Sequence, residues 1–135
     1  MFLRLCWFLS VLLIAGCASD KSDMKKLTET LRIYSATIRW GDFAQALAFI
    51  DPEVLKQKPV SQLELDRYRQ IQVGSYTESD PVVLKPGEVQ VVVEIGLVNV
   101  NTQTGRSILD KQIWHWDAKQ KRWWLTTGLP DVTRH

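Results

Sequence analysis

The apolar residues of this chain repeat with a helical period in its first part and with a strand period in the remainder. From residue 24 onward they recur every three or four residues, which places them on one face of an amphipathic helix. These residues are Leu27, Leu31, Tyr34 and Ile38. Gly41 suits the left-handed residue that ends a helix, and Asp42 with the glutamine three residues later forms a capping-box pattern. A second helix is predicted over 43–50, ending at Asp51 because proline follows it.

After about Asp66 apolar and polar residues alternate, as in a strand with one buried face. The clearest alternation runs over 89–97, and it slips at Gly96, which predicts a bulge in that strand. Further strands are expected over 68–77, 107–117 and 123–127, with turns at 85–88 and 101–105. Residues 55–65 fit either one more helical turn or a loop.

The last predicted hairpin holds four tryptophans. With 118–121 as its loop, it pairs Asp117 with Arg122, Trp116 with Trp123, His115 with Trp124 and Trp114 with Leu125. Trp114, Trp116 and Trp123 then share one face, which we interpret as core. The alternative, in which exposed rings stack on sugars or lie at a membrane interface, is considered only for Trp124, a candidate exposed contact on the polar face.

Helices followed by a long antiparallel meander with a bent strand predict an α+β domain. We expect the N-terminal helices to pack on one face of a curved antiparallel β-sheet. This order resembles the nuclear-transport-factor-2-like, cystatin-like cone. The resemblance rests on the segment WGDFAQAL at 40–47 and on 113–116 with 122–125, and it covers 25–130. We expect the cone to be lined by Tyr34, Trp114, Trp116 and Trp123. This superfamily includes isomerases, dehydratases, binding proteins and assembly modules, so the fold alone does not assign a function.

Residues 1–17 differ from the rest of the chain. Fourteen of them are apolar and Arg4 is their only charge, which is typical of an export signal. The run over 5–16 would span about 18 Å as a helix. The hydrocarbon core of a bilayer is about 30 Å thick. A membrane-spanning helix is therefore disfavoured.

The end of this segment, Ile14-Ala15-Gly16-Cys17, resembles the lipobox of bacterial lipoproteins. The resemblance implies that Cys17 receives a diacylglycerol and that residues 1–16 are removed as a signal peptide. It also implies that the new amino terminus is acylated. The alternative is a simple secreted protein, cut nearby, with Cys17 as a free thiol. Ala18 and Ser19 follow the cysteine, where the family's sorting rules place aspartate for retention at the inner membrane. We therefore expect the protein to be anchored in the outer membrane, facing the periplasm.

This interpretation divides the chain into four parts. A signal peptide (1–16) precedes the lipidated cysteine with a polar tether (17–26), the α+β domain (27–130) and a C-terminal tail (131–135). The nine residues after Cys17 would reach at most about 30 Å when extended, which keeps the domain near the bilayer. Both cysteines are used up by processing and lipidation, so no disulfide is expected.

The remaining chemistry is sparse. The chain has 17 basic and 15 acidic residues among 135, a balance that gives no strong field to attract nucleic acid. Lysines near the lipid could touch head groups, but Asp20 and Asp23 offset them, and the basic cluster at 119–122 is interpreted as a solvated turn. With two histidines and no free thiol we expect no metal site, and without a phosphate-binding loop we expect no cofactor.

Proton abstraction in a cone needs a carboxylate or histidine beside a hydroxyl. The candidates are Tyr34, Asp66, Tyr68 and His115, but His115 faces away from the tryptophans, so no catalytic residue is assigned. We expect a membrane-anchored, non-catalytic binding or assembly module that acts through its sheet face or its cone, with an envelope protein as the favoured partner. The alternative is an isomerase or dehydratase with its active site in the cone. The oligomeric state does not follow from the sequence.

Overall fold

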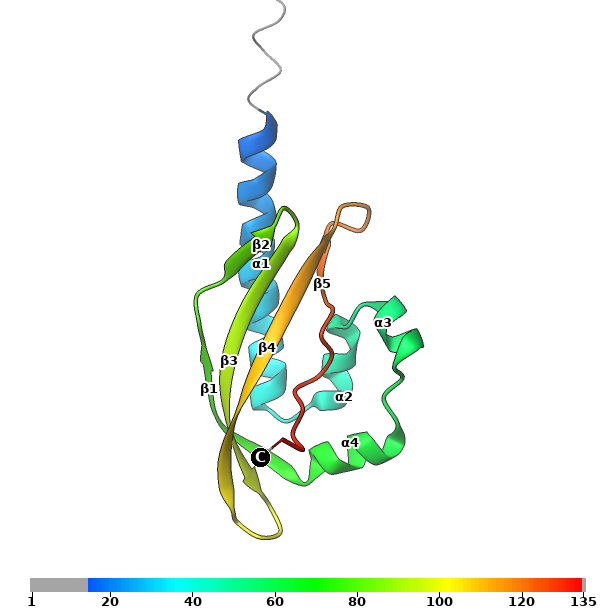
Figure 1. Cartoon of the computed structure of the whole chain (residues 1–135), viewed down its shortest axis with the longest axis vertical. Helices are drawn as coiled ribbons and strands as arrows, with labels where there is room; N and C mark the ends of the chain where they lie inside the picture. Colours follow the sequence, from blue (N-terminus) through cyan, green and yellow to red (C-terminus); the bar gives the residue numbers. More distant parts are fainter. Residues whose placement is uncertain (1–14, 135) are drawn as a thin grey trace, which may run out of the picture.

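Helices pack against one face of a curled antiparallel sheet, which forms a half-barrel (Figure 1). The computed structural model describes residues 15–134, with side chains from Lys21 onward. The helices are α1 (Ala15–Arg39), α2 (Phe43–Ala46), the 3-10 helix η1 (Leu47–Phe49), α3 (Pro52–Gln57) and α4 (Gln62–Arg69). The strands are β1 (Ile71–Glu78), β2 (Val82–Lys85), β3 (Glu88–Asn99), β4 (Gly105–Asp117) and β5 (Arg122–Leu125). The predicted α+β class is confirmed.

The long helix α1 begins earlier than the sequence pattern predicts. The polar residues 18–26, interpreted from the sequence as a tether, are helical. No glycine or proline interrupts this stretch, and Trp123 Nε1 donates a hydrogen bond to the Asp23 carbonyl at 2.7 Å, which fixes the helix against β5. At about 1.5 Å per residue, nine helical residues span about 13 Å, less than half of the extended length. Residues 1–14 of the predicted signal peptide, and His135, lie outside the described residues.

The predicted end of α1 and start of α2 are confirmed. Gly41 has φ +74°, and the Asp42 carboxylate accepts a hydrogen bond from Gln45 N at 3.1 Å. By contrast, α4 covers residues for which the sequence left a helical turn and a loop open, and it continues into the start of the strand predicted over 68–77. Its signal in the sequence is a capping box, in which Ser61 Oγ accepts from Glu64 N at 3.2 Å and Glu64 Oε2 accepts from Ser61 N at 2.8 Å.

The sheet has the order β1-β3-β4-β5, with β2 pairing β3 beyond the end of β1. In β3 the odd-numbered residues from Val89 to Leu97 are buried without interruption. The bulge predicted in this strand is therefore wrong; the register shifts instead in β1, between Val73 and Ser75. This irregularity lies opposite Gly96, where a Cβ would collide with Ser75 Oγ. The glycine marks a bulge in the neighbouring strand.

The last hairpin has the predicted register. All four pairs occur: Asp117 with Arg122, Trp116 with Trp123, His115 with Trp124 and Trp114 with Leu125. The turn is held by the Asp117 carboxylate, which accepts hydrogen bonds from the backbone N–H groups of Lys119 and Gln120. Three tryptophans of this hairpin, Trp114, Trp116 and Trp123, contact α1.

The segment after β5 crosses the end of the concave face. Pro130 and Val132 are buried, and Tyr68 donates a hydrogen bond to the Pro130 carbonyl at 2.8 Å. Arg106 donates to the carbonyls of Val132 and Arg134. The core thus includes residues as far as Val132, beyond the expected domain boundary at 130.

Candidate functional site

The concave face of the sheet is filled by side chains. All four residues predicted to line the cone lie there: Tyr34 and Trp114 are fully buried, Trp123 is buried and Trp116 is half-buried. Tyr34 meets Trp114 edge-on with ring centroids 5.3 Å apart, and Trp116 meets Trp123 at 5.4 Å. The structure therefore brings these residues together as packing partners rather than as the walls of an open cavity.

A polar cluster lies inside this packing. The Gln112 side chain is completely buried, and its Nε2 donates hydrogen bonds to Tyr76 OH at 3.0 Å and to Asp110 Oδ2 at 2.9 Å. Its Oε1 accepts from Trp114 Nε1 at 3.2 Å. Asp110 and Gln112 were not among the site residues predicted from the sequence. Strand parity with Trp114 is the signal that could have found them, because every second residue of β4 faces the core.

Burial governs the charges of this cluster. It raises the pKa of the Asp110 carboxyl, and the hydrogen bond from Gln112 partly offsets that shift. Burial also raises the pKa of Tyr34 and of Tyr76 well above their ordinary values, so both are neutral phenols. Within the described residues, the Tyr34 hydroxyl has no hydrogen-bond partner. An enclosed acid with a raised pKa beside a hydroxyl is an arrangement also found at proton-transfer sites.

The other predicted proton-transfer candidates lie elsewhere. Asp66 is on α4 and forms an ion pair with Arg69 at 3.0 Å. Tyr68 stacks on Phe43 with ring centroids 4.4 Å apart and uses its hydroxyl on the backbone of the C-terminal segment. His115 is exposed on the opposite face of β4. The structure brings neither Asp66 nor His115 to Tyr34, and in residues 21–134 no three His, Cys, Asp or Glu side chains are grouped as metal ligands would be.

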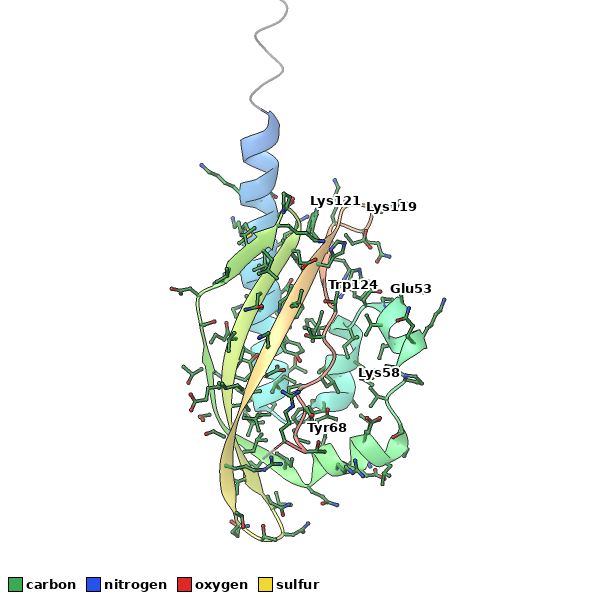
Figure 2. All side chains as sticks on the ribbon, viewed as in Figure 1. Glu53, Lys58, Tyr68, Lys119, Lys121 and Trp124 are labelled. Carbon is green, nitrogen blue, oxygen red and sulfur yellow. The ribbon has the colours of Figure 1, made fainter. Side chains whose placement is uncertain are left out.

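Trp124 is on the polar face as predicted, but it is not an exposed contact, because only 8% of it is accessible. The Arg122 guanidinium lies 3.4 Å from the centroid of the Trp124 ring. Trp124 Nε1 donates a hydrogen bond to Asp117 Oδ2 at 3.2 Å. The ring lines a hollow of about 540 Å³ that also includes Glu53 of α3 (Figure 2). Neighbouring residues shield the Trp124 ring from solvent, and the hairpin register alone does not predict their positions.

A larger hollow of about 610 Å³ lies between α3, α4 and the C-terminal segment. Lys58 and Tyr68 line it (Figure 2), together with the apolar Val54 and Leu129 and the charged Arg67. Neither hollow is lined by Asp110, Gln112 or Tyr34. Both are therefore surface features, separate from the polar cluster in the core.

Within residues 15–134, no helix covers the outer face of β3 and the middle of β4 (Figure 1). Leu109 of β4 is 66% exposed there, flanked along the strand by exposed Lys111 and His115 and half-buried Ile113. On the neighbouring strand, Val92 and Val98 are half-buried and share this face with Leu109. The face is thus a mixed apolar and polar surface around one exposed leucine.

Comparison with known proteins finds no matching family model, no matching curated protein and no matching solved structure. Across residues 15–134, none of the helices combines the length and the apolar character needed to cross a membrane.

Proposed function

We propose that this protein is a bacterial envelope lipoprotein. Acyl chains on Cys17 anchor it to the outer membrane, where it faces the periplasm. The support is the apolar segment that ends in Ile14-Ala15-Gly16-Cys17, followed directly by polar residues. Two or three acyl chains give stable anchoring, whereas one holds only marginally. The described part of α1 begins at Ala15, so lipid on Cys17 would sit at the first turn of this helix.

Replacing the acylated cysteine tests the anchor. Cys17→Ser is expected to abolish incorporation of labelled fatty acid in a lipoprotein-processing bacterium and to move the protein out of the membrane fraction. Cys6→Ser is the matched control, because this proposal removes Cys6 with the signal peptide; it should leave labelling unchanged. Fatty-acid labelling that persists in Cys17→Ser would contradict the proposal.

We further propose that the domain is a non-catalytic binding or assembly module, similar in architecture to the cystatin-like cones, and that its partner is an envelope protein. The observation that carries this proposal is the packing of the concave face, where Tyr34 and Trp114 meet and where Asp110 and Gln112 are buried. A ligand or substrate would have to displace these side chains, whereas the outer face around Leu109 is open to a partner. This favours binding over the alternative of an isomerase or dehydratase with a site at Tyr34 and Asp110.

Site-specific crosslinking tests the binding surface. A photo-crosslinking residue in place of Leu109 should give a discrete protein adduct in intact cells. The same residue in place of Leu63 of α4 is the matched control, because that leucine is 62% exposed, close to the 66% of Leu109. An adduct at Leu63 but not at Leu109 would contradict a partner on the sheet face.

A further inference from the structure

One end of the molecule gathers the start of α1, the β2–β3 turn (86–87) and the β4–β5 turn (118–121); we call it the N-terminal pole (Figure 1). Besides the bond from Trp123 to Asp23, Trp116 N donates to the Gly87 carbonyl at 2.9 Å. Lys26 Nζ lies 5.5 Å from the centroid of the Trp116 ring. Helix and turns are therefore fixed to one another.

The N-terminal pole is rich in lysine. Its exposed lysines are Lys21, Lys25, Lys26, Lys85, Lys119 and Lys121. Two of the nearby acids are engaged: Glu88 pairs with Lys85 at 3.5 Å, and Asp117 accepts hydrogen bonds from its own turn and from Trp124. Asp20 and Asp23 of α1 offset part of the remaining positive charge, so lysines still outnumber acids at the pole. At the other end of the same strands, the β3–β4 turn (100–104) has no charged side chain. The two ends of the sheet thus differ in charge.

An apolar strand lies beside these lysines. Val82, Val83 and Leu84 of β2 are all exposed, and among the described strands β2 pairs only with β3. An exposed apolar edge strand is a liability that proteins usually protect. Lysines next to exposed apolar side chains are the combination found in segments that lie on a lipid interface.

The N-terminal pole is also where the predicted anchor joins the domain. Cys17, the first residue of the proposed mature protein, precedes Asp23 by about 9 Å of helix. We propose that the N-terminal pole rests on an anionic lipid surface, with its lysines on the head groups and Val83 and Leu84 at the interface. This inference depends on the proposed lipid anchor. A second copy is a less suitable occupant, because pairing would bring two sets of lysines together.

Docking in this way orients the domain. The β3–β4 turn and α4 lie at the end opposite the N-terminal pole (Figure 1). With the pole on the lipid, these elements point away from the membrane, and the outer face of the sheet is left accessible from the side. The surface proposed for a protein partner therefore stays free while the pole is docked.

Quenching by spin-labelled lipid tests the docking. The full, processed lipoprotein, reconstituted in phosphatidylcholine vesicles with and without phosphatidylglycerol, carries a fluorophore on Gln120→Cys at the pole or on Asn101→Cys at the opposite turn. We expect head-group quenching at position 120 only, strongest with phosphatidylglycerol and weakened by salt.

A lysine near an anionic surface strengthens association about fivefold. Lys119→Gln with Lys121→Gln should thus lower the ratio of docked to undocked protein about 25-fold, whereas Lys56→Gln with Lys58→Gln at the end of α3 should not.

Flotation of the same samples separates the two proposals. Protein that floats with the vesicles but is quenched equally at positions 120 and 101 would overturn the docking and leave the anchor intact. Protein that does not float would overturn both. Fluorophore self-quenching at position 120 in lipid-free detergent would assign the pole to a second copy and overturn its contact with lipid.

Discussion

Trp114→Ala should lower the free energy of unfolding by about 3–5 kcal/mol. The indole is completely buried, lies between Val89 and Leu125 on the neighbouring strands and meets Tyr34 of α1 edge-on. Its removal leaves a cavity between helix and sheet and deprives Gln112 Oε1 of its donor. Chemical denaturation followed by circular dichroism measures the loss.

Two variants separate packing from hydrogen bonding. Trp40→Ala removes an indole that is 88% exposed and should change the free energy of unfolding by no more than about 0.5 kcal/mol. Trp114→Phe keeps an aromatic ring but loses the Nε1–H donor, and should cost about 1–3 kcal/mol. If Trp114→Ala were as mild as Trp40→Ala, the concave face would not depend on this packing, and a ligand site in the cone would again be the better proposal.

The features that the sequence predicts well depend on neighbouring residues. The end of α1 at Gly41, the cap at Asp42 and the register of the last hairpin each follow from a few residues and a short turn. Residues 18–26 have the polarity of a linker, yet they contain no glycine or proline and form the start of α1. The capping box at Ser61 was present in the sequence, but the surrounding residues lack a clear apolar period.

The features that the sequence does not predict depend on contacts with residues far along the chain. Gly96 correctly indicated an irregularity, but only the pairing of β1 with β3 shows that the extra residue belongs to β1. The accessibility of Trp124 depends on Arg122 folding over its ring. For the candidate site, Tyr34 and the tryptophans were expected inside the cone, whereas the buried Asp110 was overlooked because a carboxylate usually marks a solvent-facing position.

Gln112→Leu should cost about 2–4 kcal/mol at neutral pH. The substitution keeps a side chain of similar size but removes the donor to Asp110 and Tyr76 and the acceptor for Trp114 Nε1. Each buried polar group left without a partner costs about 1–3 kcal/mol. Gln72→Leu on exposed β1 surface is the matched control and should change the free energy of unfolding by no more than about 0.5 kcal/mol.

The pH dependence of this cost identifies Asp110 as the group that Gln112 supports. Burial raises the pKa of Asp110 in the folded state, so its contribution to stability is fully present below the unfolded value of 3.8 and is lost as pH rises through the folded pKa. Gln112 lowers that folded pKa, so Gln112→Leu raises it further and extends the loss to higher pH. The cost of Gln112→Leu should therefore be smaller at acidic pH than at neutral pH.

An Asp110→Asn background provides the decisive comparison. Without a titrating carboxyl at position 110, the cost of Gln112→Leu should no longer vary with pH, while acids outside the cluster, such as Glu64 and Asp131, contribute equally to both members of the comparison. Urea titrations of the four variants across the acidic range measure this difference. A cost that varies with pH to the same extent in both backgrounds would show that Gln112 does not act through Asp110. A constant cost in the Asp110→Asn background would show that Gln112 acts through Asp110, within a network whose hydrogen bonds join β4 to Tyr76 of β1 across the filled concave face.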